Sequence, residues 1–162
     1  MKPYAPLMLY AIAHNIRSLH NVGSMLRTAD AAGVEKVFLT GYTPAPTDVF
    51  GHVRSDIAKT ALGAENTVLW EKAKDIGKCI RALKSEGVHI VALEQDKRAI
   101  DYKTWKPKHP LALIVGNEVR GLSRSVLNQC DAIIEIPMRG KKESLNVSVA
   151  FGIGVFEIMP RI

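Results

Sequence analysis

Three short segments of the chain concentrate charged, amide and glycine residues, at positions 15–30, 116–123 and 137–147. Guanidinium and ammonium groups bind phosphate, carboxylates accept hydrogen bonds, and amide side chains both donate and accept. Glycine allows a backbone to approach a ligand closely. Such segments are typical of a site for an anionic substrate, provided that the elements around them bring the three together.

Several common motifs are absent, which narrows the kind of site. The sequence contains no GxxxxGK[ST], no HExxH and no GxSxG, and Gly152-Ile153-Gly154 lacks the third glycine of a dinucleotide fingerprint. The five histidines are scattered, and Cys79 and Cys130 lie far apart. We therefore expect no metal site, two inert thiols and a reducing, cytoplasmic setting.

Apolar and amphipathic stretches alternate along the whole chain. Runs rich in aliphatic and β-branched residues predict strands, at Leu7–Ala13, Val34–Thr40, Thr67–Trp70, Val88–Leu93, Leu111–Val115 and Ala132–Ile136. Helical spacing and capping residues predict helices, at Val22–Ala32, Ser55–Leu62 with Ser55 as N-cap, Lys72–Ser85, Ser123–Asn128 and Leu145–Met159.

Strands that alternate with helices and are apolar on both faces predict an α/β fold. Its parallel sheet is expected to be covered by helices on both faces. Ligands bind such sheets at the carboxyl ends of the strands. Each polar segment directly follows a predicted strand, so we expect all three to meet at that edge.

Composition and charge fit a globular domain that binds an anionic partner, or equally a soluble enzyme with a basic surface. The 162 residues are 47% hydrophobic and 23% charged, which excludes a disordered chain and a disulfide scaffold. Lys plus Arg outnumber Asp plus Glu by 22 to 16, and a net charge of +6 favours an anionic partner, with nucleic acid first. The sequence has no run of basic residues interleaved with aromatic ones, the pattern that would predict base stacking.

The predicted last helix is apolar nearly all round, with glycines at 152 and 154. A helix without a polar face is buried on more than one side, which in one small domain predicts a subunit interface, and the glycines would allow close helix approach. No apolar run reaches the roughly 20 residues of a membrane span, so we expect no membrane association.

The three segments, in order, resemble the three motifs of the SpoU (TrmH-like) family of RNA ribose 2′-O-methyltransferases, within the SPOUT superfamily. The resemblance extends from about Leu7 to the last helix. The first motif is matched by Asn21 with Arg-Thr-Ala at 27–29, and the second by residues 113–121. The third motif is matched by residues 136–138 together with 144–150. A fourth, softer match covers residues 59–65.

This resemblance implies properties that composition and periodicity do not predict. Family members have a parallel sheet whose C-terminal part forms a deep trefoil knot that holds S-adenosylmethionine, and they release S-adenosylhomocysteine. They are homodimers whose C-terminal helices meet and whose sites border the interface. We expect a single SpoU-type domain over residues 1–162 without a separate RNA-recruiting domain, a compactness that favours tRNA over rRNA.

The resemblance assigns catalysis to Arg27, Asn21, Glu118, Ser144 and Asn146. Arg27 is implied to activate the ribose 2′-hydroxyl. A guanidinium with a pKa above about 12 is a poor base, so we favour a role in binding the adjacent phosphate and stabilising the developing oxyanion. Both roles stay open.

Local structural roles compete with these assignments. Asn21 could cap a helix beginning near Val22, and Ser144 and Asn146 could cap the last helix. Glu118 could be a carboxylate favoured by a helix N-terminus.

The resemblance also implies residues that hold the cofactor and the RNA. Core packing and turn geometry are the alternatives for the cofactor set, which is Leu93, Gly116, Asn117, Gly121, Ile136, Met138 and Leu145. A solvated loop is the alternative for the basic RNA set, which is Arg120, Arg139, Lys141 and Lys142.

Two other functions stay open beside S-adenosylmethionine-dependent ribose methylation. One is a SPOUT dimer that binds RNA but has lost catalysis, against which the intact Arg27, Glu118, Ser144 and Asn146 argue. The other is a methyltransferase of the same superfamily that acts on a base, against which Arg27 and the Ser-Leu-Asn run at 144–146 argue.

Overall fold

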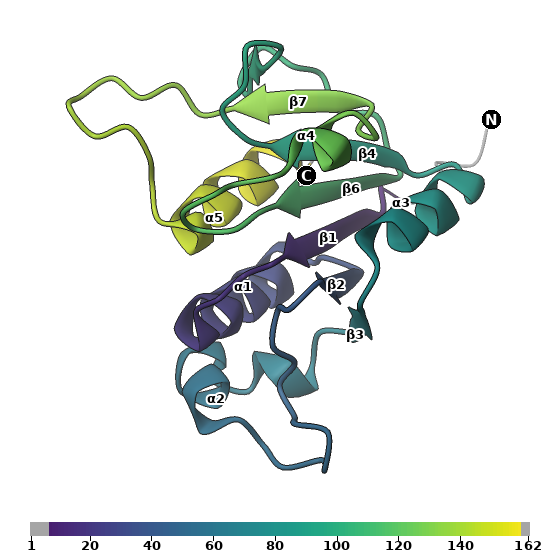
Figure 1. The fold of residues 1–162 in the computed structure, drawn as a ribbon, viewed down its shortest axis with the longest axis vertical. Coiled ribbons are helices and arrows are strands. Elements are labelled where there is room, and N and C mark those ends of the chain that lie inside the picture. Colours follow the sequence, from purple (N-terminus) through teal and green to yellow (C-terminus); the bar gives the residue numbers. More distant parts are fainter. Residues whose placement is uncertain (1–6, 160–162) are drawn as a thin grey trace.

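The computed structural model describes residues 7–159, and within them seven strands form one sheet (Figure 1). Each pair of neighbouring strands runs parallel. The spatial order is β3-β2-β1-β6-β4-β7-β5. The strands are β1 Leu9–His14, β2 Lys36–Thr40, β3 Trp70–Ala73, β4 His89–Leu93, β5 Ile100–Asp101, β6 Leu111–Val115 and β7 Ala132–Glu135. The predicted parallel α/β sheet is confirmed.

Helices pack on both faces of this sheet, as predicted. Alternate side chains of a strand point to opposite faces, so Leu113 and Ile114 of β6 enter different buried clusters. Leu113 shares its cluster with Met25 and Phe151, and Ile114 shares the other with Ile80. The helices are α1 Leu19–Ala32, α2 Ser55–Ala61 and α5 Val147–Ile158 on the first face, and α3 Ile76–Ser85 and α4 Arg124–Leu127 on the second.

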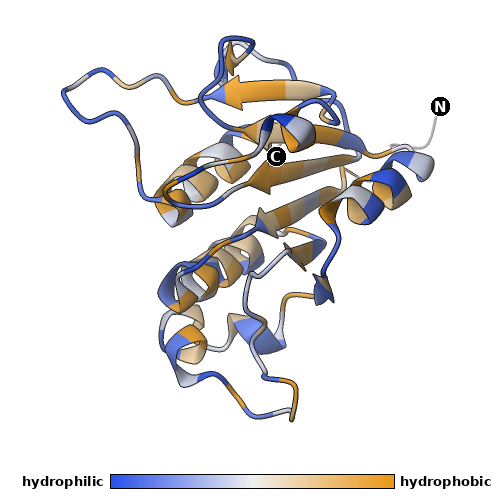
Figure 2. Cartoon of the chain, in the orientation of Figure 1, coloured by the Kyte–Doolittle hydropathy of each residue, from blue (hydrophilic) through white to orange (hydrophobic). Residues whose placement is uncertain are grey.

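The central strands carry the most apolar sequence in the molecule (Figure 2). Every residue of β6 is buried. Strands buried on both faces read as continuous apolar runs, which is why β6 was predicted with its observed bounds. Among residues 7–159, no helix combines the length and apolar character needed to cross a membrane.

The order of the strands reverses between β1 and β6. The chain continues from β1 to β2 on one side and from β6 to β7 on the other. The last paired residues of these two strands are Ala13 and Val115, so the segments that follow them leave the sheet side by side. Such a reversal in an open parallel sheet opens a crevice where ligands bind.

Two predicted elements in the middle of the chain were placed wrongly. The strand expected at Thr67–Trp70 begins only at Trp70, and the helix expected from Lys72 begins only at Ile76. Lys72 instead lies in β3 opposite Leu39. Asp75 caps α3 by accepting a hydrogen bond from the Lys78 N–H at 3.0 Å.

The starts of two other helices also differ from prediction. α1 begins at Leu19, because the Ser18 hydroxyl caps it and accepts a hydrogen bond from the Asn21 N–H at 3.2 Å. Asn21 is therefore not the N-cap. Arg54, rather than Ser55, occupies the N-cap position of α2 and makes no capping hydrogen bond with its side chain.

The C-terminal helix and one short strand also differ from the prediction. α5 begins at Val147 rather than Leu145, with Asn146 as its N-cap. β5 was not predicted, because its two residues pair only with β7 and carry no periodicity. The trefoil knot implied by the family resemblance stays a prediction.

Candidate active site

A pocket of about 360 Å³ opens at the carboxyl ends of β4, β6 and β7. This volume is within the range of small-molecule sites. The loops after these strands and the start of α5 form its walls. All seven residues implied for the cofactor line it: Leu93, Gly116, Asn117, Gly121, Ile136, Met138 and Leu145.

The pocket is acidic, which sequence reasoning missed. Four glutamates line it against one basic residue, Arg120. Of the four, only Glu118 was predicted. Glu94 and Glu135 stand at the ends of strands, a position that could have indicated them, whereas Glu143 lies in a long loop. A cation would be favoured in such a pocket.

A chain of hydrogen bonds joins residues from all three polar segments. Asn21 Nδ2 donates to Glu118 Oε1 at 3.1 Å, and Asn146 Nδ2 donates to Asn21 Oδ1 at 3.1 Å. These residues come from α1, from the turn after β6 and from the N-cap of α5. The expected meeting of the three segments is therefore observed.

Glu118 lies at the N-terminus of α1 and receives three hydrogen bonds there. The backbone N–H groups of Arg17 and Ser18 each donate to its carboxylate at 3.1 Å, beside the bond from Asn21. Burial alone would raise the pKa of Glu118, but these three hydrogen bonds, together with its own backbone N–H, outweigh burial and hold that pKa below its ordinary value. The carboxylate is thus ionised at neutral pH, and the helix N-terminus that favours it is α1.

Asn146 combines a capping role with a place in the hydrogen-bond chain. Its Oδ1 accepts from the N–H of Ser148 at 2.8 Å and from that of Val149 at 3.4 Å, which starts α5. Its Nδ2 bonds Asn21. Asn146 therefore caps α5 and also takes part in the hydrogen-bond chain with Asn21.

The loop between β7 and α5 reaches away from the body of the molecule (Figure 1). Within residues 7–159, the backbone of 137–145 makes no hydrogen bond to another backbone group. One side-chain bond holds the loop, from Gln95 Nε2 to the carbonyl of Glu143 at 2.6 Å. Ser144 and Leu145 are exposed on it and line the pocket, so its polar backbone groups are available to a ligand.

The two glycines of the second segment are required by packing within the chain. A Cβ on Gly116 would lie 2.7 Å from Leu122, and one on Gly121 would lie 2.4 Å from Glu94 Oε2. Gly121 also has φ +63°, which favours glycine. Turn geometry, the alternative interpretation, accounts for Gly121, and close packing against Leu122 accounts for Gly116.

Asn117 holds the same turn and connects it to the loop after β2. Its Oδ1 accepts from the N–H groups of Val119 and Arg120 at 2.9 and 2.8 Å. Its Nδ2 donates to the Asn15 carbonyl at 3.1 Å and to the Tyr42 hydroxyl at 2.8 Å. Sequence reasoning expected the 41–53 loop, which contains Tyr42, to contribute to substrate recognition, but did not single out Tyr42 itself.

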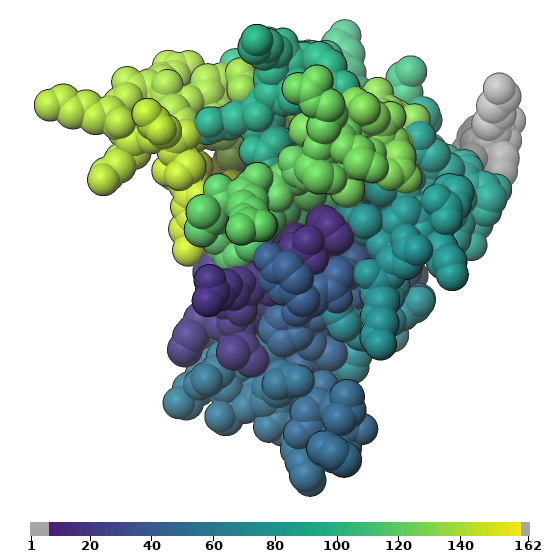
Figure 3. All heavy atoms as spheres, viewed as in Figure 1, coloured from purple at the N-terminus to yellow at the C-terminus, as the bar shows by residue number. Residues whose placement is uncertain are grey.

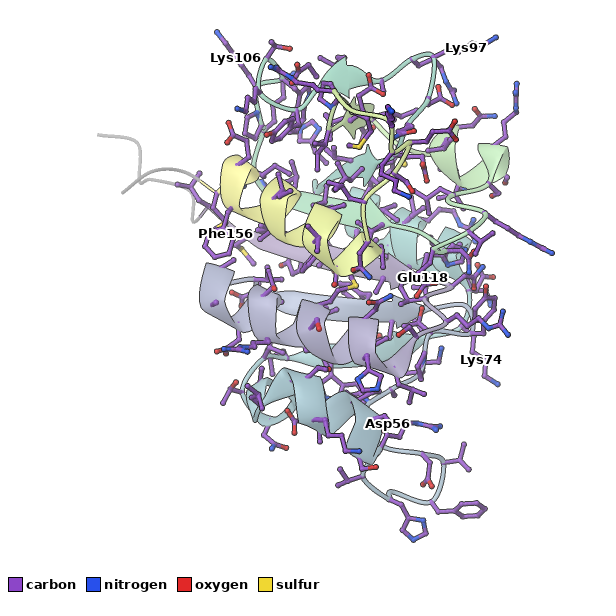
Figure 4. The ribbon with its side chains drawn as sticks, turned by 90° about the vertical axis from the view of Figure 1, so that its left-hand side faces the viewer. Asp56, Lys74, Lys97, Lys106, Glu118 and Phe156 are labelled. Atoms are coloured by element: carbon purple, nitrogen blue, oxygen red, sulfur yellow. The ribbon has the colours of Figure 1, made fainter. Side chains whose placement is uncertain are left out.

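Within one chain, Arg27 does not line this pocket. It lies six residues beyond Asn21, which along an α-helix is about 9 Å. It is exposed and borders a different hollow of about 510 Å³, together with Thr28, Lys59 and Phe156. Figure 4 shows Phe156 at the opposite end of α5 from Glu118.

The remaining predicted residues are exposed. Arg139, Lys141 and Lys142 lie on the loop between β7 and α5. Away from the pocket, burial raises the pKa of Cys79 and of Cys130 to about 11, so both thiols are protonated and unreactive at neutral pH.

The sequence was compared with models of known families. The model of the SpoU rRNA Methylase family matches residues 8–156, nearly the whole chain. The chain belongs to this family.

Curated relatives agree with the SpoU assignment. The chain is 36% identical over 156 residues to the 23S rRNA (guanosine-2′-O-)-methyltransferase RlmB of Ralstonia nicotianae, covering 94% of this chain and 57% of the relative. It is 36% identical over 152 residues to a putative TrmH family tRNA/rRNA methyltransferase of Staphylococcus haemolyticus, covering 94% of this chain and 58% of that protein. The chain thus spans less than two thirds of these SpoU relatives.

A solved SpoU-like structure has the same fold. The AdoMet-bound rRNA methyltransferase from Sinorhizobium meliloti superposes with a TM-score of 0.83 at 29% identity, over 96% of this chain and 60% of that one. The expected preference for tRNA over rRNA gains no support from these names, because rRNA appears in each of them and tRNA in one.

Proposed function

We propose that this SpoU domain transfers a methyl group from S-adenosylmethionine to a ribose 2′-hydroxyl of RNA, with rRNA as the first candidate substrate. The observation that carries the proposal is the hydrogen-bond chain from Glu118 through Asn21 to Asn146 beside the pocket. The names of the relatives supply the reaction and the RNA class.

The residues of the pocket fit the cofactor. When bound, S-adenosylmethionine supplies a methyl group on a positively charged sulfonium. Leu93, Ile136 and Met138 offer apolar walls, and the unpaired backbone of 137–145 offers donors and acceptors for a heterocycle. The four glutamates favour a positively charged ligand over its neutral product.

The chain's own residues would position the reacting oxygen. Because Glu118 can only accept, Asn21 must turn Nδ2 toward it and Oδ1 toward Asn146. Asn146 Oδ1 is occupied by the start of α5, so both amides have one allowed orientation. One N–H of Asn146 Nδ2 then remains to donate to the oxygen as it gains negative charge, in a geometry fixed beforehand.

We also propose that the domain acts as a homodimer through α5. Val149, Ile153 and Phe156 follow helical spacing and are 50%, 37% and 57% exposed, an apolar face that a monomer would leave in water. Arg27 borders this face beside Phe156. A dimer would bring Arg27 toward the pocket of the partner subunit, where it could bind phosphate and stabilise the oxyanion.

Transfer of label from S-adenosylmethionine to separated rRNA and tRNA tests the proposal. We expect label in rRNA, and loss of at least 100-fold in rate with Arg27→Ala, the scale at which one donor to an oxyanion acts. Label only in tRNA would show that the substrate is tRNA rather than rRNA. No label in either RNA, with no rise in melting temperature on adding S-adenosylhomocysteine, would favour an RNA-binding domain without catalysis.

A further inference from the structure

The loop between β2 and α2 projects from one end of the molecule (Figure 3). It presents apolar side chains to solvent. Tyr42, Val49, Phe50 and Val53 are 59%, 92%, 81% and 68% exposed. A cluster of large apolar side chains on the surface of a soluble domain indicates a contact with a partner.

The tip of this loop has a defined conformation of its own. Asp48 Oδ1 accepts hydrogen bonds from the N–H groups of Phe50 at 2.8 Å and of His52 at 2.9 Å. The Phe50 and His52 rings lie 6.2 Å apart, and Thr47 pairs with Val53 in an antiparallel bridge. A preformed tip binds without the entropic cost of ordering a flexible loop.

The root of the loop is continuous with the candidate active site. The Tyr42 N–H donates to Asn15 Oδ1 at 3.1 Å, and the Tyr42 hydroxyl accepts from Asn117 Nδ2 at 2.8 Å. Asn117 lines the pocket, so the exposed Tyr42 lies next to a residue of the candidate active site.

Positive charge lies at the same root. Lys72 Nζ donates to the carbonyls of Gly41 and Thr43, and the Gly41 N–H donates to the Lys74 carbonyl. Lys74 is exposed on the same edge of the molecule as Glu118 (Figure 4). Aromatic rings next to ammonium groups suit a nucleic acid strand, since the rings can stack on bases and the lysines can bind phosphates.

We propose that the 42–53 loop binds unpaired nucleobases of the RNA, with Tyr42 and Phe50 as stacking surfaces. This inference rests on the proposed function, because it takes RNA as the substrate. Specific RNA recognition uses single-stranded segments whose bases stack on aromatic side chains. The sequence lacks an interleaved basic and aromatic run, whereas the fold joins Lys72 of β3 to the carbonyls of Gly41 and Thr43, on either side of Tyr42.

Binding of a fluorescein-labelled oligouridylate 12-mer, compared with a 12-base-pair RNA duplex, tests this assignment. Phe50→Leu and Tyr42→Leu retain apolar area but lose the ring, and each should weaken binding of the single strand about fivefold or more. Phe50→Trp and Tyr42→Phe keep a ring and should bind within about twofold of the unaltered protein. Leu69→Ala, which removes an exposed aliphatic side chain outside the loop, is the control and should bind normally.

Two results would overturn the stacking role. One is unchanged affinity of both leucine variants for the single strand. The other is equal loss in leucine and aromatic variants, which would indicate a general apolar contact. Methyl transfer to bulk rRNA by the same proteins separates the two proposals. If the leucine variants bind the single strand with unchanged affinity and methyl transfer is intact, only the loop proposal is rejected. If the leucine variants bind more weakly and no protein transfers a methyl group, only the enzyme proposal is rejected.

Discussion

At the scale of single residues, the Glu118 carboxylate is balanced by fixed dipoles rather than by a cation. Two backbone N–H groups and the Asn21 amide surround it. Glu118→Gln would replace one acceptor oxygen by an NH₂ group that faces donors. We expect the free energy of unfolding to fall by about 1–3 kcal/mol, the cost of leaving polar groups without partners. Urea denaturation measures it, and Glu86→Gln, an exposed glutamate at the end of α3, is the control.

The same residue predicts a pH dependence with a definite sign. The folded pKa of Glu118 lies below its ordinary value of 4.5, because hydrogen bonds to the carboxylate outweigh burial. A lowered folded pKa stabilises the fold above the unfolded pKa, and this contribution is lost as the pH falls through the lower folded value. The stability difference between the unaltered protein and Glu118→Gln should therefore shrink below about pH 4. A difference that stays constant down to pH 3 would contradict the assignment.

The sequence predicted that residues of the three motifs meet, but not which other groups bond them. Asn21, Glu118 and Asn146 were found from motifs after strands, and the structure joins them. The bonds from Arg17 and Ser18 to Glu118 span about 100 residues and leave no local pattern, so they could not be predicted. Arg27 was expected at the same centre, and its place beside Phe156 follows only from the packing of α1 against α5.

At the scale of elements, two glycines of α5 have different neighbours. A Cβ on Gly154 would lie 2.9 Å from Leu93 in the sheet, whereas one on Gly152 would lie 3.6 Å from Thr28 of α1. Gly154 is therefore required by packing within the chain, whereas a Cβ at position 152 would make only ordinary contact. The expectation that both glycines allow close approach between subunits stays a prediction.

A matched pair of alanine variants tests this difference. Gly152→Ala should stabilise the fold by about 0.5–1 kcal/mol through the helix propensity of alanine. Gly154→Ala should destabilise it by about 1–3 kcal/mol through overpacking. It should also weaken binding of S-adenosylhomocysteine, because Leu93 lines the pocket. Thermal unfolding and calorimetric titration measure the two effects, and equal stabilisation by both variants would refute the packing argument.

The bounds of an element were predicted well where a single sequence pattern determines them. The aliphatic run of β6 was placed correctly, because burial on both faces leaves no competing pattern. The helical spacing from Lys72 onward was misleading, because pairing of Lys72 with β2 and capping by Asp75 both override it. The pairing of Lys72 is a tertiary preference that a local window cannot detect, whereas Asp75 is a local capping residue that could have indicated the start of α3.

At the scale of the whole molecule, the apolar face of α5 predicts a dimer. Phe156→Asp places a charge on this face and should give a monomer in sedimentation velocity experiments, whereas the unaltered protein should sediment as a dimer. Leu69→Asp, at an exposed apolar residue before β3, is the control and should remain dimeric. If the unaltered protein is a monomer, or if the Phe156→Asp variant is still a dimer, the α5 interface is wrong.

The fold class followed from local patterns, but the threading of the chain could not. Alternating strands and helices predicted a parallel sheet with two covered faces, and the sheet has them. A knot depends on the order in which distant segments pass one another, which no periodicity records, and general rules of connectivity argue against it. The trefoil knot is therefore a prediction from family resemblance alone.

The most direct test of the account is nucleoside analysis of RNA methylated by this protein. After incubation of rRNA with labelled S-adenosylmethionine, digestion and mass spectrometry locate the added methyl group. The account predicts a 2′-O-methylnucleoside, formed by the unaltered protein and lost with Asn146→Ala. A methyl group on a base would contradict the ribose assignment, and unmethylated RNA from a protein that binds S-adenosylmethionine would contradict the proposed substrate.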